Sequence, residues 1–104
     1  MLIAGNWKMN LGFKELEEFF CLAENILFSN RVDLCIIPPA PLLREAKTNL
    51  NKNHNLTMLK IGAQNTHYKS KGPFTGDISP NLLYEIGCNY VLTGHSERRM
   101  YHYE

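Results

Sequence analysis

The sequence predicts an α/β fold of about four βα units with parallel strands, and three patterns support this prediction. Short apolar runs alternate along the chain with longer amphipathic stretches, which is typical of parallel βα units. The runs contain few polar residues, as expected for strands that are covered on both faces. Polar clusters follow the first and the last run, and parallel strands collect such clusters at one end of a sheet.

The four strands are expected near residues 2–6, 33–37, 59–64 and 90–93. Between the first two runs, apolar residues recur at the spacing of a helix face, and the charged residues fall elsewhere. That apolar face consists of Phe13, Leu16, Phe19, Phe20, Ala23 and Leu27. The segment is therefore expected to be an amphipathic helix on the outside of the sheet.

Prolines and a glycine mark the next two helices. Pro41 suits the first turn of a second helix, whose apolar stripe is Leu42, Leu43 and Ala46. Residues 49–55 are expected to be a polar surface connection. In the third helix we expect Ser79 as the N-cap, Pro80 as the first helical residue and Gly87 just past the end.

The composition is that of one globular domain. The 104 residues are 44% hydrophobic and 20% charged, which argues against disorder. Eleven basic and ten acidic residues leave a net charge of +1 with no basic run, so no nucleic acid partner is expected. No apolar stretch has the length of a membrane span, and the start lacks the pattern of a signal peptide. We expect no membrane partner and a cytoplasmic location.

The three cysteines, Cys21, Cys35 and Cys88, are scattered. They form no Cys-x-x-Cys pair, and no histidine stands at zinc-finger spacing from them. Free cysteine behaves as a small hydrophobic residue, so we expect three buried, reduced thiols. Neither a metal nor a cofactor is expected.

Four motifs in order along the chain resemble the triosephosphate isomerase family, whose members are (β/α)8 barrels. They are Asn6-Trp7-Lys8 and the segments GAQN at 62–65, GPFTGDIS at 72–79 and GHSERR at 94–99. A complete barrel needs about 250 residues. The resemblance therefore implies that residues 1–104 are the amino-terminal part of such a barrel, an incomplete (β/α)8 barrel without a second domain.

His95 is the first candidate catalytic residue. It follows the fourth strand and precedes Ser96, which we expect to be the N-cap of a helix. The partial positive charge of a helix N-terminus disfavours an imidazolium ion. The resemblance implies that this neutral imidazole donates a hydrogen bond to a substrate carbonyl and stabilises an enediolate. The alternative is a histidine that only caps the helix or packs against it.

Lys8 and Asn6 lie two residues apart, which places both side chains on one side of an extended backbone. A fixed cation there attracts a phosphorylated triose and stabilises negative charge on its oxygen. An isolated lysine after a strand is more often simply solvated. The resemblance implies that Asn6 and Lys8 bind substrate and that Lys8, His95 and Glu97 are catalytic. Glu97 has the alternative role of a favourable acid in the first turn of a helix.

The connection at residues 65–78 is longer than most loops in compact domains. The resemblance implies that this loop inserts into the other subunit of a homodimer, with Phe74, Thr75 and Gly76 at its tip. An ordinary turn-rich surface loop is the alternative. The resemblance also ties Arg98 and Arg99 into ion pairs near that interface.

The implied function is the interconversion of dihydroxyacetone phosphate and glyceraldehyde 3-phosphate in glycolysis and gluconeogenesis. The family's general-base glutamate and its phosphate loops have no counterpart in the 104 residues, so the chain alone is expected to be inactive. Tyr103 stands where the family has a glycine, which affects the start geometry of the last helix. Two alternatives remain. The first is a non-catalytic half-barrel that associates with itself or with a separately encoded remainder. The second, a nucleotide binder, lacks the glycine-rich loop it would need.

Overall fold

The structure is a computed structural model that describes residues 1–26, 29 and 31–104. Its elements, in chain order, are β1 (Leu2–Asn6), α1 (Phe13–Ala23), β2 (Asp33–Ile37), the short 3-10 helix η1 (Ala40–Leu42), α2 (Leu43–Lys52), β3 (Leu59–Ala63), α3 (Pro80–Ile86), β4 (Tyr90–Val91) and α4 (Ser96–His102). All neighbouring strands are parallel, and their order in the sheet is β1-β2-β3-β4. The predicted α/β fold of four βα units is confirmed.

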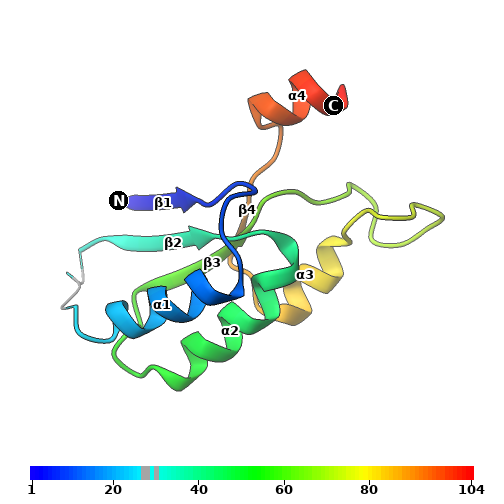
Figure 1. Ribbon diagram of the computed structural model, residues 1–104. Coiled ribbons are helices and arrows are strands. Elements are labelled where there is room, and N and C mark those ends of the chain that lie inside the picture. Colours follow the sequence, from blue (N-terminus) through cyan, green and yellow to red (C-terminus); the bar gives the residue numbers. More distant parts are fainter. Residues whose placement is uncertain (27–28, 30) are drawn as a thin grey trace.

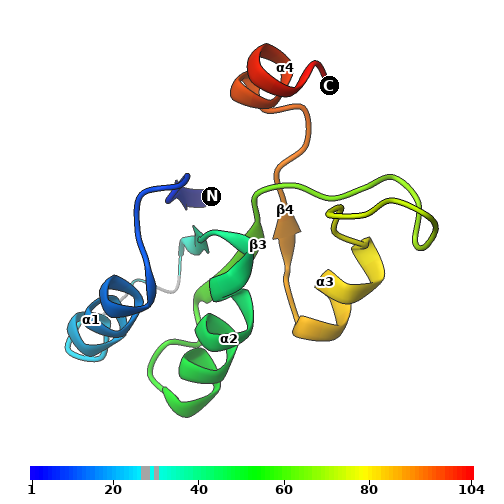
Figure 2. The same ribbon diagram turned by 45° about the vertical axis from the view of Figure 1, so that its right-hand side comes forward.

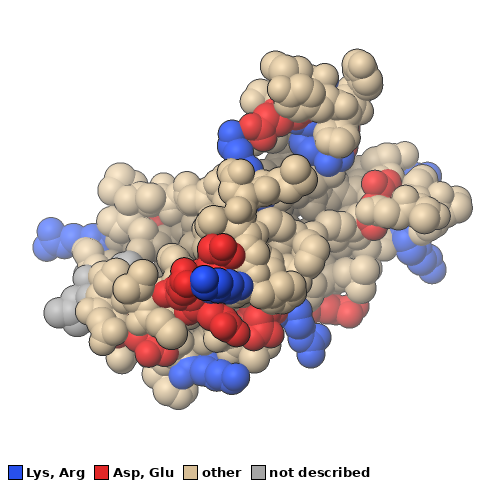
Figure 3. Space-filling model, viewed as in Figure 1, with Lys and Arg blue, Asp and Glu red and all other residues tan. Residues whose placement is uncertain are grey.

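Of the four α-helices in the described residues, three pack on one face of the sheet, and the fourth does not. Helices α1, α2 and α3 cover one face of the sheet, and α4 stands apart, beyond the carboxyl end of β4 (Figures 1 and 2). Acidic and basic side chains are interspersed over the helices in the view of Figure 3, and the side of α4 turned toward the sheet carries both signs. The core consequently lies between the sheet and the first three helices.

Most apolar residues of this core come from α1, α2 and the two central strands, and α3 adds Leu83. The largest fully buried side chains include Leu16 of α1, Leu43 of α2 and Ile61 of β3. The predicted face of α1 is confirmed at Leu16, Phe20 and Ala23, which are buried. Phe13 is 56% exposed, and Leu27 lies outside the described residues.

Helix α3 begins and ends as its sequence predicts. The Ser79 hydroxyl accepts a hydrogen bond from the Asn81 N–H at 3.1 Å, and Pro80 is the first helical residue. Gly87 closes the helix with a φ of 92°, in the left-handed region. A β carbon there would lie 2.8 Å from Cε of Lys47, which is the far end of a flexible side chain, so the backbone angle is what favours glycine.

Three boundaries differ from the prediction. Helix α2 continues to Lys52, so residues 49–52 are helical and only 53–55 belong to the polar connection. The amide of Asn49 donates to the Glu45 carbonyl at 3.1 Å, which lets a polar residue remain within the helix. Strand β3 ends at Ala63 rather than at residue 64, and β4 ends at Val91 rather than at residue 93.

The cysteines are only partly as expected. Cys35 is buried, and this burial raises the pKa of its thiol to about 11. Burial also raises the pKa of the half-buried Cys88. Cys21 is exposed, because it lies on the solvent side of α1, so the expectation of three buried thiols is wrong for Cys21.

The outer strands are not covered as predicted. Leu2 and Ile3 of β1 are 46% and 51% exposed, and both residues of β4 are exposed. Each of these strands has only one neighbour in the sheet, which leaves one row of backbone groups free. An apolar groove of about 440 Å³ lies between β1 and α1. In the part of the chain that the structure describes, no helix has both the length and the apolarity to cross a membrane.

Truncation of the core should be costly. Leu16→Ala removes a side chain that is fully buried between α1 and the sheet, so the free energy of unfolding should fall by about 2–5 kcal/mol. Leu22→Ala is the matched control, because Leu22 is on the same helix and is 70% exposed; it should change stability by less than about 0.5 kcal/mol. Urea unfolding followed by circular dichroism measures both. Equal losses in the two variants would contradict this description of the core.

The exposed edge and groove should make the isolated chain associate with itself. Sedimentation velocity should show an average mass above 12.0 kDa that rises with protein concentration. Ile3→Lys on β1 should reduce the association, whereas Leu82→Lys should not, although Leu82 of α3 is similarly exposed at 53%. A sharp thermal transition from a concentration-independent monomer would contradict the expectation.

Candidate active site

A pocket of about 290 Å³ is lined by residues at the carboxyl ends of β1 and β3 and by residues of α4. Its lining is mostly polar and ionisable: Asn6, Lys8, Met9, Gln64, His95, Glu97, Arg98, Tyr101 and His102. The pocket thus brings Asn6 and Lys8 together with His95 and Glu97, which are almost the length of the chain away in sequence.

Lys8 reaches this pocket from a turn and not from an extended strand. Its φ is 52°, in the left-handed region that residues with a β carbon seldom adopt. The Lys8 N–H donates to Oδ1 of Asn6 at 2.9 Å, and the Trp7 N–H donates to the Ile37 carbonyl at 3.0 Å. The prediction that Asn6 and Lys8 share one side of an extended backbone is therefore wrong, because β1 ends at Asn6 and the Asn6 side chain holds the turn that follows.

His95 is itself the N-cap of α4. Its Nδ1 accepts a hydrogen bond from the Glu97 N–H at 3.1 Å, and Ser96 is the first helical residue, so the prediction of Ser96 as the cap is wrong. Nδ1 is as many bonds from the backbone as the oxygen of a capping asparagine, which explains why a histidine suits this position. His95 therefore caps the helix through Nδ1, and a role for its Nε2 toward a ligand stays a prediction.

The cap determines the tautomer of His95. A backbone N–H only donates, so Nδ1 must offer a lone pair and the ring proton must be on Nε2. Nδ1 also lies 3.6 Å from Oε2 of Glu97, but with its lone pair directed at the Glu97 N–H it has no proton to give that carboxylate. A neutral ring with a proton on Nε2 is the form that donates a hydrogen bond to a carbonyl oxygen.

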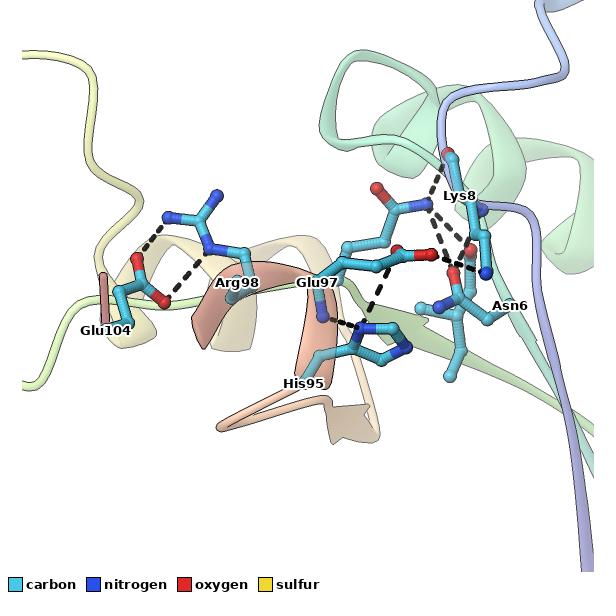
Figure 4. Close-up of polar contacts among 8 residues, drawn as sticks. Asn6, Lys8, His95, Glu97, Arg98 and Glu104 are labelled. Carbon is cyan, nitrogen blue, oxygen red and sulfur yellow. Dashed lines mark hydrogen bonds and ion pairs between the residues drawn. The ribbon is translucent and has the colours of Figure 1, made fainter. Parts of the chain in front are cut away.

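Glu97 connects the two halves of the pocket. Its Oε1 accepts a hydrogen bond from Nζ of Lys8 at 2.6 Å, and the two side chains point toward one another (Figure 4). The Lys8 ammonium beside it lowers the pKa of the Glu97 carboxyl below its ordinary value. Glu97 also occupies the first turn of α4, where a negative charge interacts favourably with the helix N-terminus. Glu97 therefore also fits the alternative role that was predicted for it.

Gln64 was given no role by the sequence analysis, although it belongs to one of the four motifs. Its Nε2 donates to the carbonyl oxygen of Lys8 at 2.7 Å and to that of Ile37 at 3.2 Å. The signal available in the sequence was its place directly after β3, where the side chains of parallel strands converge on one edge.

The end of α4 is held by a second ion pair. Arg98 donates from Nε to Oε2 of Glu104 at 3.0 Å and from its terminal nitrogen to Oε1 (Figure 4). Arg98 thereby lowers the pKa of the Glu104 carboxyl. Tyr103 lies between them with a φ of 57°, at the C-cap of the helix. Tyr103, at the position where the resemblance implies a glycine, therefore lies at the end of α4 rather than at its start, and it adopts the left-handed angle that glycine prefers.

The long loop has structure of its own. Residues 65–78 contain no helix or strand, and Phe74, Thr75 and Gly76 do not line the pocket. The ring of Phe74 stacks on His67 with 4.0 Å between ring centres, and His67 stacks on Tyr68 at 4.5 Å. Asp77 lies 3.7 Å from Nε2 of His67. The loop projects to the side of the sheet away from β1 (Figure 1).

Within the described ranges, no group of three or more His, Cys, Asp or Glu side chains is arranged to hold a metal ion. An ammonium and an imidazole Nε2–H supply donors for an anionic, oxygen-rich ligand, and two amides line the same space.

Four parallel βα units in sequential order, with ionisable side chains gathered at the carboxyl ends of the strands, are characteristic of the (β/α)8 barrel class of enzymes. The family model described as triosephosphate isomerase matches residues 1–104. The chain belongs to the triosephosphate isomerase family.

Curated relatives named triosephosphate isomerase agree with this assignment. The protein of Finegoldia magna is 44% identical over 98 residues, which cover 94% of this chain and 38% of the relative. The protein of Aquifex aeolicus is 44% identical over 99 residues, with the same two shares of 94% and 38%. That of Mycobacterium tuberculosis is 43% identical over 109 aligned positions, which cover 99% of this chain and 40% of the relative. The chain thus spans about two fifths of the length of these relatives.

The contact between Lys8 and Glu97 should be visible in a pH titration. Because the folded-state pKa of Glu97 is lowered, the contact stabilises the protein above the ordinary value of 4.5 and is lost as the pH falls through the lowered value. Lys8→Met should raise the pKa of Glu97, measured by ¹³C NMR of its carboxyl carbon. Lys14→Met is the matched control, because Lys14 contacts Glu18 on α1 and lies outside the pocket. An unmoved Glu97 midpoint in Lys8→Met would show that the ion pair does not form in solution.

Proposed function

We propose that this chain carries part of the active site of a triosephosphate isomerase, which interconverts dihydroxyacetone phosphate and glyceraldehyde 3-phosphate through an enediolate. The observation that carries the proposal is the cap of α4, since it leaves His95 neutral with its Nε2 proton free to polarise a substrate carbonyl. Such a preorganised donor stabilises the negative charge that develops on the enediolate oxygen.

Lys8 and Asn6 bind the substrate in this proposal. The Lys8 ammonium attracts the phosphorylated triose and stabilises charge on its oxygen, and Asn6 lines the same pocket. Glu97 accepts a hydrogen bond from the Lys8 ammonium at 2.6 Å, so it helps to position that ammonium. Lys8, His95 and Glu97 are the proposed catalytic residues.

The proton transfers between the two substrate carbons need a general base. The family resemblance supplies this base from a glutamate that has no match among residues 1–104, together with the loops that bind phosphate. A positioned base contributes about 10²- to 10⁴-fold to the rate. We therefore propose that the 104 residues alone have negligible activity.

The family also suggests the setting of this function. We propose a cytoplasmic glycolytic and gluconeogenic enzyme that acts as a homodimer, with Phe74, Thr75 and Gly76 at the interface. The stack of Phe74 on His67 supports the proposed interface, because it gives the projecting loop a defined shape with which to enter a partner subunit.

A chimera tests the proposal. Residues 1–104 would replace the matching segment of the Aquifex aeolicus relative, whose remaining part would supply the base and the phosphate loops. The chimera should convert glyceraldehyde 3-phosphate in a coupled assay, and His95→Gln within it should lower kcat by about 10²- to 10⁴-fold. The isolated 104-residue chain, assayed in parallel, should show no turnover above background.

Lys14→Met provides the control for charge removal in the same chimera. Lys8→Met should lower kcat/KM strongly, whereas Lys14→Met should leave it unchanged, because Lys14 lies on α1 with 83% of its side chain exposed. A folded chimera whose activity is insensitive to both His95→Gln and Lys8→Met would contradict the proposal.

The exposed β1 edge and the apolar groove favour one second candidate, a non-catalytic half-barrel that pairs with itself or with a separately encoded remainder. Isolation of the native chain with a second polypeptide that carries the missing base would support the separate remainder. A chimera without activity, together with a stable dimer of the isolated chain, would support self-pairing.

A further inference from the structure

We propose that Gln64 is a positioning residue that holds Lys8 in its left-handed turn and thereby directs the Lys8 ammonium to Glu97 and into the pocket. The inference depends on the proposed function only for what Lys8 does to a substrate. The geometry that carries it lies entirely within the described residues.

The amide of Gln64 has two protons, and two carbonyl oxygens receive them. One is that of Lys8, at 2.7 Å, and the other is that of Ile37, the last residue of β2, at 3.2 Å. A third acceptor, Oδ1 of Asn6, lies at the limit of 3.5 Å and already receives the Lys8 N–H at 2.9 Å. The shortest of the three contacts of Gln64 is therefore the one to Lys8.

The backbone of Lys8 needs such a partner. A side chain with a β carbon is disfavoured at a φ of 52°, and such angles persist where the surroundings fix them from several directions. Asn6 holds the N–H of Lys8 and Gln64 holds its carbonyl, so both peptide groups that flank the Lys8 α carbon are fixed by side chains. Asn6 belongs to β1, the strand before the turn, whereas Gln64 directly follows β3.

Gln64 also relates this turn to the rest of the sheet. The Ile37 carbonyl that it binds also accepts the Trp7 N–H at 3.0 Å, so the turn after β1, the end of β2 and the end of β3 meet at one point. A change in Gln64 should consequently move the Lys8 ammonium relative to α4. A purely structural glutamine would instead weaken the fold and leave the pKa of Glu97 as it is in any molecule that remains folded.

The pKa of Glu97 is therefore the discriminating readout. Gln64→Met keeps the length of the side chain, removes both donors and adds no charge. In the 104-residue chain, ¹³C NMR should show the Glu97 midpoint rising toward that of Lys8→Met, which marks complete loss of the ammonium. The strong intraresidue HN–Hα nuclear Overhauser effect that marks a positive φ should weaken at Lys8.

Asn49→Leu is the matched control. It also removes an amide donor to a backbone carbonyl, that of Glu45 at 3.1 Å, but on α2, away from the pocket. Its Glu97 midpoint and Lys8 signal should match the unsubstituted chain. A Gln64→Met variant that also matches the unsubstituted chain in both readouts would overturn the proposal.

A second variant keeps the proposal testable if Gln64→Met does not fold. If Gln64→Met gives no dispersed spectrum, the isosteric Gln64→Glu is judged by the Lys8 nuclear Overhauser effect, which an added charge does not alter directly. Unfolding of both variants would contradict a positioning role and assign Gln64 to the fold. The two proposals fail separately: an inactive chimera with a shifted Glu97 midpoint removes the isomerase, whereas an active chimera with an unmoved midpoint removes the role of Gln64.

Discussion

The ion pair between Lys8 and Glu97 is the interaction on which the site depends. No residue of α4 is buried, so this helix is not held by apolar packing as α1, α2 and α3 are. Its capping histidine and its first-turn glutamate reach the pocket only because α4 stands over the carboxyl ends of the strands (Figure 4). A single charged contact of 2.6 Å joins that helix to the turn after β1.

The two halves of the pocket therefore rest on interactions of different strength. The Asn6 side chain accepts the Lys8 N–H in the turn after β1, and Gln64 donates to the Ile37 carbonyl at the end of β2. Both lie next to a core of fully buried leucine and isoleucine side chains. His95 and Glu97 are attached through an ion pair whose side chains are nearly half exposed, and solvent weakens exposed pairs. The tautomer of His95 is fixed by a hydrogen bond within α4, whereas the position of His95 relative to the strands depends on an exposed ion pair.

The structure leaves part of the sheet uncovered. Helices cover one face of the sheet, while β1, β4 and the groove beside α1 remain exposed over apolar residues. In the strand order β1-β2-β3-β4, both outer strands have a single neighbour.

Local sequence determined the elements of this protein, whereas tertiary structure decided how the site is built. Apolar runs and helical spacing predicted β1, β2 and the buried face of α1, and Ser79, Pro80 and Gly87 predicted both ends of α3, because these signals act within a few residues. The left-handed turn of Lys8, the donors of Gln64 and the contact with Glu97 join segments up to 89 residues apart. Such contacts form only when parallel strands bring their carboxyl ends together. The sequence therefore indicated the end of the sheet where these residues meet, but not which atoms bond there.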